Sequence, residues 1–142
     1  MRLIAKFPTR NRPEKFKEYF SEYQKLLSGK HDVRFIVSMD YDDASMNNPD
    51  MMEWLQKWPN TIYHYGHSKT KVQAVNANME NETGDVLMVA SDDMWPMVQD
   101  YDDVIAQKFA KHFPDYDGSL KFRDGLRDDW LMTLPILGWP CY

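Results

Sequence analysis

Short apolar runs alternate along the chain with stretches in which apolar residues recur at helical spacing. Runs rich in β-branched and aromatic residues predict strands over 3–7, 33–39, 61–65 and 86–90. Apolar residues spaced three and four apart predict helices over 13–28, 50–58, 72–79 and 98–113. Pro13 suits the first turn of a helix, and Gly29 and Gly84 each follow a helix end. This alternation predicts an α/β fold, with a mostly parallel sheet flanked by helices on both faces.

The run 86–90 is apolar at every position, which is typical of a strand that is buried on both faces of a sheet. After Asp117 and Gly118 the alternation weakens. The pattern then allows a short strand over 120–122 and an apolar stretch over 131–137 that ends at Gly138.

The length of 142 residues suits one domain, and we expect residues 1–142 to form it. Contents of 43% hydrophobic and 14% aromatic residues indicate a folded protein. Lys and Arg number 17 against 22 Asp and Glu, so the net charge of −5 disfavours general binding to nucleic acid. Cys141 is the single cysteine, and the sequence shows neither a signal peptide nor a membrane-spanning run. We therefore expect a cytoplasmic protein without a transmembrane segment.

Polar residues follow every predicted strand. In chain order they are Thr9 to Arg12, then Asp40, Asp42 and Asp43, then 66–71, then 91–93. Ligands of parallel α/β sheets bind beyond the carboxyl ends of the strands, so these segments predict one site at one edge of the sheet.

Asp92 and Asp93 directly follow the fully apolar strand. Two adjacent carboxylates repel each other unless a cation lies between them. Carboxylate oxygens suit Mg²⁺ or Mn²⁺, which share their coordination with phosphates and water. The pair therefore predicts a divalent-cation site.

Several of these features have plainer interpretations. We interpret the acidic pairs 42–43, 102–103 and 128–129 as mostly solvated surface. Lys69 and Lys71 could be ordinary exposed charges at the start of a helix, although a helix N-terminus disfavours cations. The six glycines form no Gly-x-Gly-x-x-Gly, and the chain has no phosphate loop, no Gly-x-Ser-x-Gly and no His-Glu-x-x-His. The usual dehydrogenases, P-loop enzymes and serine hydrolases are therefore disfavoured.

Four segments together resemble the family-two glycosyltransferases with the GT-A fold. They are Phe7-Pro8-Thr9-Arg10-Asn11-Arg12, Val37-Ser38-Met39-Asp40, Lys71-Val72-Gln73-Ala74-Val75-Asn76 and Val89-Ala90-Ser91-Asp92-Asp93-Met94. The resemblance covers essentially the whole chain. It implies a GT-A domain that binds a nucleoside-diphosphate sugar, first of all a UDP-sugar, with Mn²⁺ or Mg²⁺.

The resemblance also implies roles for individual residues. Thr9 and Arg10 would contact the base or ribose, and Asp40 would bond the base. Lys71 would approach the base or the phosphate. In the DxD-like acidic pair, Asp92 would meet the ribose and Asp93 the metal.

The catalytic base of the family comes from a segment that would follow about where this chain ends. Asp124, Asp128 and Asp129 are available carboxylates, but none lies in a convincing base motif, so we expect the acceptor-side segment to be missing. One alternative is a module that binds a nucleotide sugar without turnover. Another is an interaction domain anchored by Trp130, Trp139 and Tyr142. We also expect the apolar stretch 131–142 to pack against a second subunit or to be poorly ordered.

Overall fold

The computed structural model describes residues 1–123 and 134–142. Its sheet is built from β1 (Arg2–Pro8), β2 (Asp32–Asp40), β3 (Thr61–Gly66), β4 (Val86–Val89), β5 (Ser119–Leu120) and β6 (Ile136–Gly138). The helices are α1 (Pro13–Lys25), α2 (Pro49–Gln56), α3 (Lys71–Asn76), α4 (Tyr101–His112) and the 3₁₀ turn η1 (Trp139–Cys141). No helix in the described part of the chain is long and apolar enough to cross a membrane.

The sheet has the strand order β3-β2-β1-β4-β6-β5. β1 lies at its centre and pairs in parallel with β2 on one side and with β4 on the other. β3 continues the parallel part beyond β2, whereas β6 runs antiparallel to both β4 and β5. The prediction of a mostly parallel sheet flanked by helices is confirmed.

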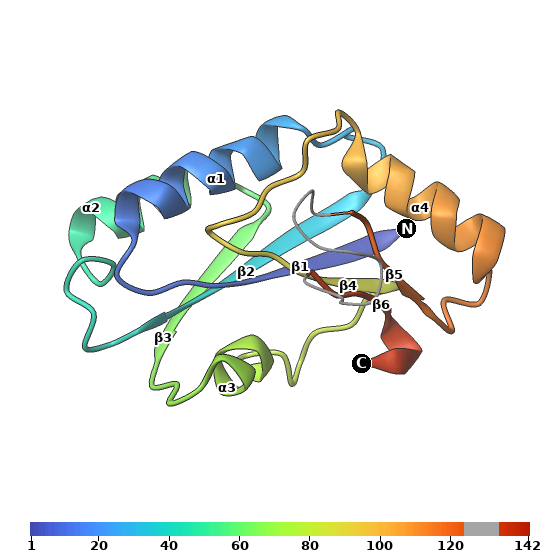
Figure 1. The fold of residues 1–142 in the computed structure, drawn as a ribbon. Coiled ribbons are helices and arrows are strands. Elements are labelled where there is room, and N and C mark those ends of the chain that lie inside the picture. The colour runs from blue at the N-terminus through green and yellow to red at the C-terminus, as the bar shows by residue number, and fades with distance from the viewer. Residues whose placement is uncertain (124–133) are drawn as a thin grey trace.

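α1 and α4 cover one face of this sheet, and α3 lies on the other (Figure 1). The strand period of two divides the side chains of β1 accordingly. Leu3, Ala5 and Phe7 enter the large core beneath α1, α2 and α4, whereas Ile4 belongs to a small cluster on the face of α3. The two faces are therefore unequal, and most of the apolar burial lies on one side.

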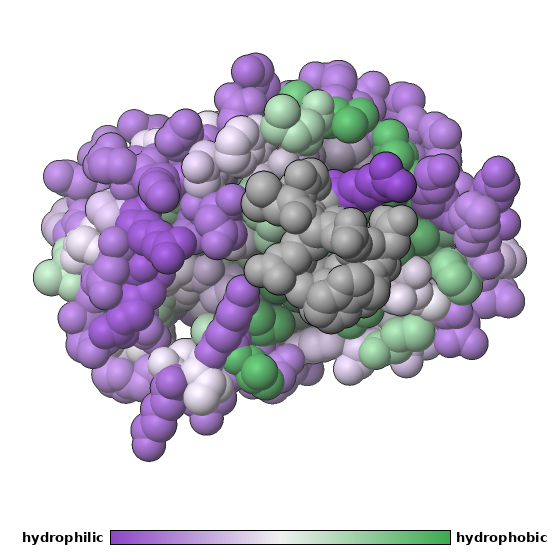
Figure 2. All heavy atoms as spheres, viewed as in Figure 1, coloured by the Kyte–Doolittle hydropathy of each residue, from purple (hydrophilic) through white to green (hydrophobic). Residues whose placement is uncertain are grey.

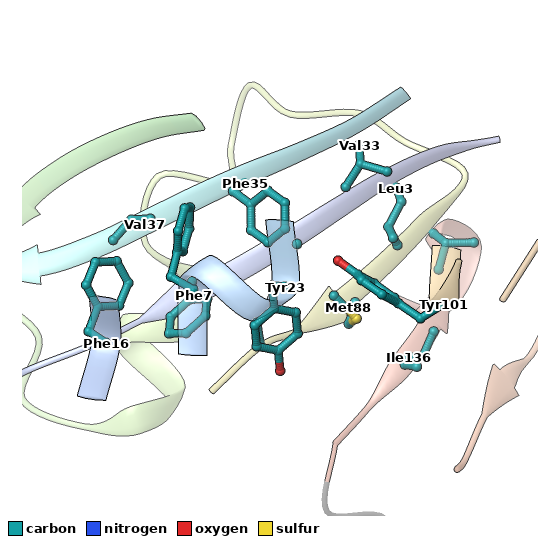
Figure 3. Close-up of a cluster of buried hydrophobic side chains, with 14 of the residues drawn as sticks. Leu3, Phe7, Phe16, Tyr23, Val33, Phe35, Val37, Met88, Tyr101 and Ile136 are labelled. Atoms are coloured by element: carbon teal, nitrogen blue, oxygen red, sulfur yellow. The ribbon is translucent and has the colours of Figure 1, made fainter. Parts of the chain in front are cut away.

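Aromatic side chains make up much of the large core (Figure 3). α1 begins with Pro13 in its first turn and buries Phe16, Phe20 and Tyr23. The ring centroid of Phe7 on β1 lies 5.1 Å from that of Phe16 and 5.5 Å from that of Tyr23, both edge-to-face. Such pairs add about 0.5–1.5 kcal/mol each beyond their buried area. This packing holds α1 directly over the end of β1, where the loop that follows β1 begins.

A fully buried lysine, Lys6, lies on the opposite face of β1. Its ammonium group donates to the hydroxyl oxygen of Ser38 on β2 and to the carbonyl oxygen of Ala77, each at 2.5 Å. Burial lowers the pKa of Lys6 to about 8, although nearby Glu80 opposes the shift. Because Ala77 directly follows α3, Lys6 ties this short helix to the centre of the sheet.

α3 is shorter than its apolar spacing predicts. It ends at Asn76 because Ala77 is extended and Asn78 adopts a left-handed conformation with φ of 62°. Met79 is still buried, but it reaches the small cluster from outside the helix. The helical spacing therefore identified a buried residue correctly and placed it in the wrong element.

The C-terminal stretch differs from its prediction. Within the described part of 131–142, β6 is an interior strand between β4 and β5, and Ile136 is 3% exposed. Trp139 packs against the small cluster on the face of α3. The alternative of poor order does not hold for β6, because antiparallel pairing with β4 satisfies its backbone groups, and packing of the stretch against a second subunit stays a prediction. Residues 131–133 and Trp130 lie outside the described residues.

Replacing Gly138 by Ala should lower the free energy of unfolding by at least about 2 kcal/mol, which is the scale of overpacking. A Cβ atom at Gly138 would lie 1.6 Å from the carbonyl oxygen of Tyr116, so β6 would have to move. Gly66→Ala is the matched control, because a Cβ there meets nothing within 4 Å. Urea unfolding of both variants checks this, and equal stabilities would contradict the packing of β6.

The stability of the protein should rise between about pH 7 and about pH 9.5 by on the order of 1–3 kcal/mol through Lys6. In this window the unfolded chain keeps the Lys6 proton while the folded chain, with its lowered pKa, releases it. Tyr23 and Tyr101, whose pKa values burial raises, act in the opposite direction only above about pH 10. Lys6→Met should remove the rise, and urea unfolding at both pH values measures it. The same pH dependence in both proteins would refute the assignment to Lys6.

Candidate functional site

The carboxyl ends of β1, β2 and β4 meet at one edge of the sheet because the three strands are parallel neighbours. The loops that follow them carry Thr9 to Arg12, Asp40 to Asp43 and Ser91 to Asp93. Hydrophilic side chains predominate on the left of the molecule in Figure 2, where the ends of β1, β2 and β3 lie in the same view. The structure therefore gathers the loops that the sequence predicted to meet.

Asp92 is held by the loop that follows β1. Thr9 donates its hydroxyl to Oδ2 of Asp92 at 2.9 Å, and Nη1 of Arg12 donates to Oδ1 at 3.0 Å. Asp92 is 7% exposed, so its charge is compensated by Arg12 rather than by bulk water. Each oxygen of Asp92 thus has one donor from the β1 loop.

Arg10 reaches the neighbouring loop, which follows β2. Its Nη1 atom lies 2.5 Å from Oδ2 of Asp40 and 2.8 Å from Oδ1 of Asp42, and its Nη2 atom lies 3.1 Å from Oδ2 of Asp42. The hydrogen bond from Arg10 lowers the pKa of the exposed Asp42 below its ordinary value. Asp40 also accepts the backbone N–H of Ser68 at 3.1 Å, so the segment between β3 and α3 borders the site.

Asp43 anchors the middle of the β1 loop. Its Oδ2 atom accepts the backbone N–H of Asn11 at 2.6 Å. Its Oδ1 atom accepts the N–H and the hydroxyl of Ser45 at 3.1 Å and 2.6 Å. Burial raises the pKa of Asp43, but the hydrogen bonds from Ser45 and Asn11 outweigh it, so the pKa lies below its ordinary value.

Asp93 points away from these contacts and is exposed. Its carboxylate accepts the hydroxyl of Ser91. The residues after it are fixed against α1, because Trp95 stacks on Tyr19 with ring centroids 4.6 Å apart and Tyr23 donates its hydroxyl to the Met94 carbonyl at 2.9 Å. Asp93 is therefore an accessible carboxylate on a loop that packing holds in place.

A cavity of about 440 Å³ opens beside Asp93. Its walls are mostly apolar and include Met88, Met97, Ile105 and Phe122. The exposed Asp93 carboxylate therefore lies between the polar edge of the sheet and an apolar hollow.

Of the residues that the sequence predicted for the nucleotide, Thr9, Arg10, Asp40 and Asp92 come together in one network of contacts. Lys71 does not join that network. It is exposed at the start of α3, where the side chain of Thr70 accepts the N–H of Gln73 at 3.2 Å.

Three residues of the network were not predicted as site residues. From the sequence, Arg12 was placed in the polar loop and assigned no role, and Asp42 and Asp43 were interpreted as solvated surface. For Asp43 that interpretation is wrong, because it is 2% exposed. A serine two residues after an aspartate is typical of a local turn that the carboxylate closes, and this signal could have identified Asp43.

The same interpretation is wrong for Asp102. This residue is fully buried in the first turn of α4 and accepts the N–H and the hydroxyl of Ser28 at 2.8 Å and 2.7 Å. It fails because sequence spacing does not show that the loop after α1 packs against the start of α4. Asp124, Asp128 and Asp129, the carboxylates considered as a catalytic base, lie outside the described residues.

Neither a protein-family profile nor a curated protein matches the sequence. Solved structures do match the fold. Mannosyltransferase PcManGT from Pyrobaculum calidifontis, in complex with GDP-Man and Mn²⁺, superposes with a TM-score of 0.77 at 13% identity. That match covers 96% of this chain and 44% of the mannosyltransferase.

S. aureus TarS 1-349 gives a TM-score of 0.65 at 11% identity, over 97% of this chain and 47% of that chain. CMP:2-keto-3-deoxy-manno-octonic acid synthetase, in complex with CTP, gives 0.52 at 12% identity, over 79% of this chain and 48% of the synthetase. In each of these three comparisons the match covers less than half of the other chain. Because the likeness covers nearly the whole of this chain in the first two, the chain has the GT-A-type fold of nucleotide-sugar transferases.

Proposed function

We propose that this chain binds a nucleoside-diphosphate sugar, specifically a UDP-sugar, together with Mn²⁺ or Mg²⁺, as the donor domain of a glycosyltransferase. The observation that carries the proposal is the contact of one loop with two strand ends. Thr9 and Arg12 hold Asp92, while Arg10 holds Asp40, all at the ligand-binding edge of a GT-A-type sheet.

Asp40 and Asp92 are the groups proposed to recognise the nucleoside. Their carboxylates accept hydrogen bonds, which suits an N–H on a base and the hydroxyls of a ribose. Both are largely buried and oriented by neighbouring donors, so little side-chain entropy is lost when a ligand binds. Arg10 is about half exposed, so its guanidinium group is accessible to a diphosphate at this edge.

The residues present fit a cation that arrives with phosphate. No group of three or more His, Cys, Asp or Glu side chains in residues 1–123 and 134–142 is arranged to hold a metal. Asp92 already has a donor on each oxygen, so Asp93 is the carboxylate offered to the cation. Mg²⁺ commonly binds through one or two carboxylates, with phosphate oxygens and water completing its shell. Asp93 would hold the cation on the diphosphate.

The chemical role of the site follows from charge. A bound divalent cation stabilises the negative charge that develops on the diphosphate as the bond to the sugar breaks. The chain itself contributes the guanidinium groups of Arg10 and Arg12 beside the same edge, and it orients the nucleoside through Asp40 and Asp92. Transfer to an acceptor hydroxyl also needs a base, which we do not assign within the described residues.

The structural neighbours support a nucleotide as the ligand, although not the uracil base in particular. The mannosyltransferase was solved with GDP-Man and Mn²⁺, and the synthetase with CTP. At 11–13% identity they support a nucleotide-binding fold. The identity of the nucleotide base depends on the residues of this chain.

Asp93→Asn should weaken the binding of UDP in the presence of Mn²⁺ by roughly tenfold or more, the scale of one charge-assisted contact. The substitution keeps the shape of the side chain and removes its charge. Without Mn²⁺, UDP should bind poorly to the wild-type protein, because the diphosphate would face the negative charges of Asp92 and Asp93. Titration calorimetry with UDP, with and without Mn²⁺, measures both effects.

Asp115→Asn is the matched control, because Asp115 is an exposed aspartate in the turn after α4 and lies outside the site network. It should bind UDP and Mn²⁺ as the wild-type protein does. If Asp93→Asn and wild type bind with equal affinity, Asp93 is not the cation ligand. If neither UDP nor GDP binds the wild-type protein with Mn²⁺ present, the proposed function itself is wrong.

A further inference from the structure

We infer that Asp43 is a positioning residue of the nucleotide site, which acts by fixing the loop Thr9–Arg12 and touches no ligand itself. The inference rests on the proposed function and concerns a residue outside the predicted site. It starts from the position of Asp43 at the base of the loop, where the backbone N–H of Asn11 meets its Oδ2 atom at 2.6 Å.

The loop presents its two arginines in different directions. Arg10 lies against Asp40 and Asp42 at the end of β2, whereas Arg12 lies against Asp92 after β4. Asn11 stands between them in the left-handed region with φ of 56°. This reversal of the backbone points the N–H of Asn11 toward Asp43. The same residue that separates the two guanidinium groups is therefore the one that Asp43 anchors.

The anchor is rigid on its own side. Asp43 is 2% exposed, and Ser45 donates both its N–H and its hydroxyl to Oδ1. Asp43 also begins a turn, in which its carbonyl accepts the N–H of Met46 at 3.1 Å and of Asn47 at 2.7 Å. Met46 is fully buried in the large core. Asp43 therefore anchors the β1 loop to the packed interior of the protein.

The two oxygens of Asp43 accept from different partners, Oδ2 from Asn11 and Oδ1 from Ser45. A substitution can therefore remove one set of hydrogen bonds and keep the other. Asn at this position can keep its carbonyl oxygen on the two donors of Ser45. Its amide N–H₂ then faces the N–H of Asn11, and two donors oppose each other. Asp43→Asn should therefore preserve the local turn and release the loop Thr9–Arg12.

Asp102 provides a matched control. It is also a buried carboxylate that accepts one backbone N–H and one serine hydroxyl, here both from Ser28. Ser28 lies between α1 and β2, at the amino ends of the strands and so at the edge opposite the site. Asp102→Asn should therefore lower stability as Asp43→Asn does, without reaching the nucleotide loop.

The test measures UDP affinity in the presence of Mn²⁺ by calorimetry, at a temperature where thermal unfolding shows each variant fully folded. Asp43→Asn should weaken UDP binding about tenfold, because Arg10 and Arg12 lose their fixed directions. Asp102→Asn should lose thermal stability but bind UDP within about twofold of wild type. A purely structural role for Asp43 would lower the melting temperature and leave the affinity of the folded protein unchanged.

A second pair of variants tests the loop without altering Asp43. Asn11→Gly retains the left-handed conformation and the N–H, so it should bind UDP within about twofold of wild type. Asn11→Ala disfavours that conformation, so it should bind several-fold more weakly. This pair carries the test if Asp43→Asn does not fold.

The outcomes separate this inference from the proposed function. If Asp43→Asn binds UDP as tightly as the wild-type protein does, the positioning role is wrong and the proposed function stands. If Asp43→Asn is unfolded, equal UDP affinity in wild type and both Asn11 variants has the same meaning. Equal weakening in Asp43→Asn and Asp102→Asn also overturns the positioning role, because the effect would then follow stability. No nucleotide binding by the wild-type protein overturns the proposed function, and the positioning role falls with it.

Discussion

The parallel pairing of β1 with both β2 and β4 is the constraint on which the rest of the site depends. Strands β2 and β4 are distant in sequence, and only their common neighbour brings their carboxyl ends within reach of one loop. The short side chain of Thr9 already contacts Asp92, and the longer side chains of Arg10 and Arg12 contact Asp40 and Asp92. Phe7, packed edge-to-face against Phe16 and Tyr23, fixes the point from which that loop departs. The large aromatic core therefore determines the geometry of the polar site at the strand ends.

Charge sets the second constraint. The carboxylates of Asp40, Asp42, Asp43, Asp92 and Asp93 lie on the loops of this edge, and the guanidinium groups of Arg10 and Arg12 compensate only part of their charge. Asp43 needs no cation, because the N–H and hydroxyl donors around it stabilise its charge. Asp93 is exposed and, among the described residues, accepts the hydroxyl of Ser91, so its charge faces solvent. Under the proposed function, a divalent cation bound at Asp93 would offset part of this charge.

The periodicity of apolar residues in the sequence predicts the regular part of the fold, in which strands and helices alternate. The four strands of the parallel region and the helices between them follow from alternating apolar runs and helical spacing, as the bounds of β1, β2, β3 and β4 show. The antiparallel strands β5 and β6 are only two and three residues long, which is too short for a period to be recognised. Close packing determines the structure in these two strands. Gly138 in β6, for example, approaches the backbone of Tyr116 too closely for any side chain.

The site was predictable to the extent that it follows from the ends of strands. Thr9, Arg10, Asp40 and Asp92 each stand just beyond a strand, so topology alone brings them together. Asp43 and Asp102 were interpreted as solvated because adjacent acidic residues usually are; Ser45 is a local signal for Asp43, whereas the burial of Asp102 depends on its contact with the distant Ser28. In each pair, tertiary contacts select one carboxylate for burial and leave its neighbour nearer to solvent.

The buried partner in each pair accepts a backbone N–H from a distant loop, from Asn11 in one case and Ser28 in the other. An unpaired buried N–H costs as much as a lost hydrogen bond. The backbone of a distant loop therefore takes part in placing each inward-turned aspartate. For Asp102 this contact arises only once the sheet has brought the loops together, so no pattern confined to one segment of the sequence reveals it.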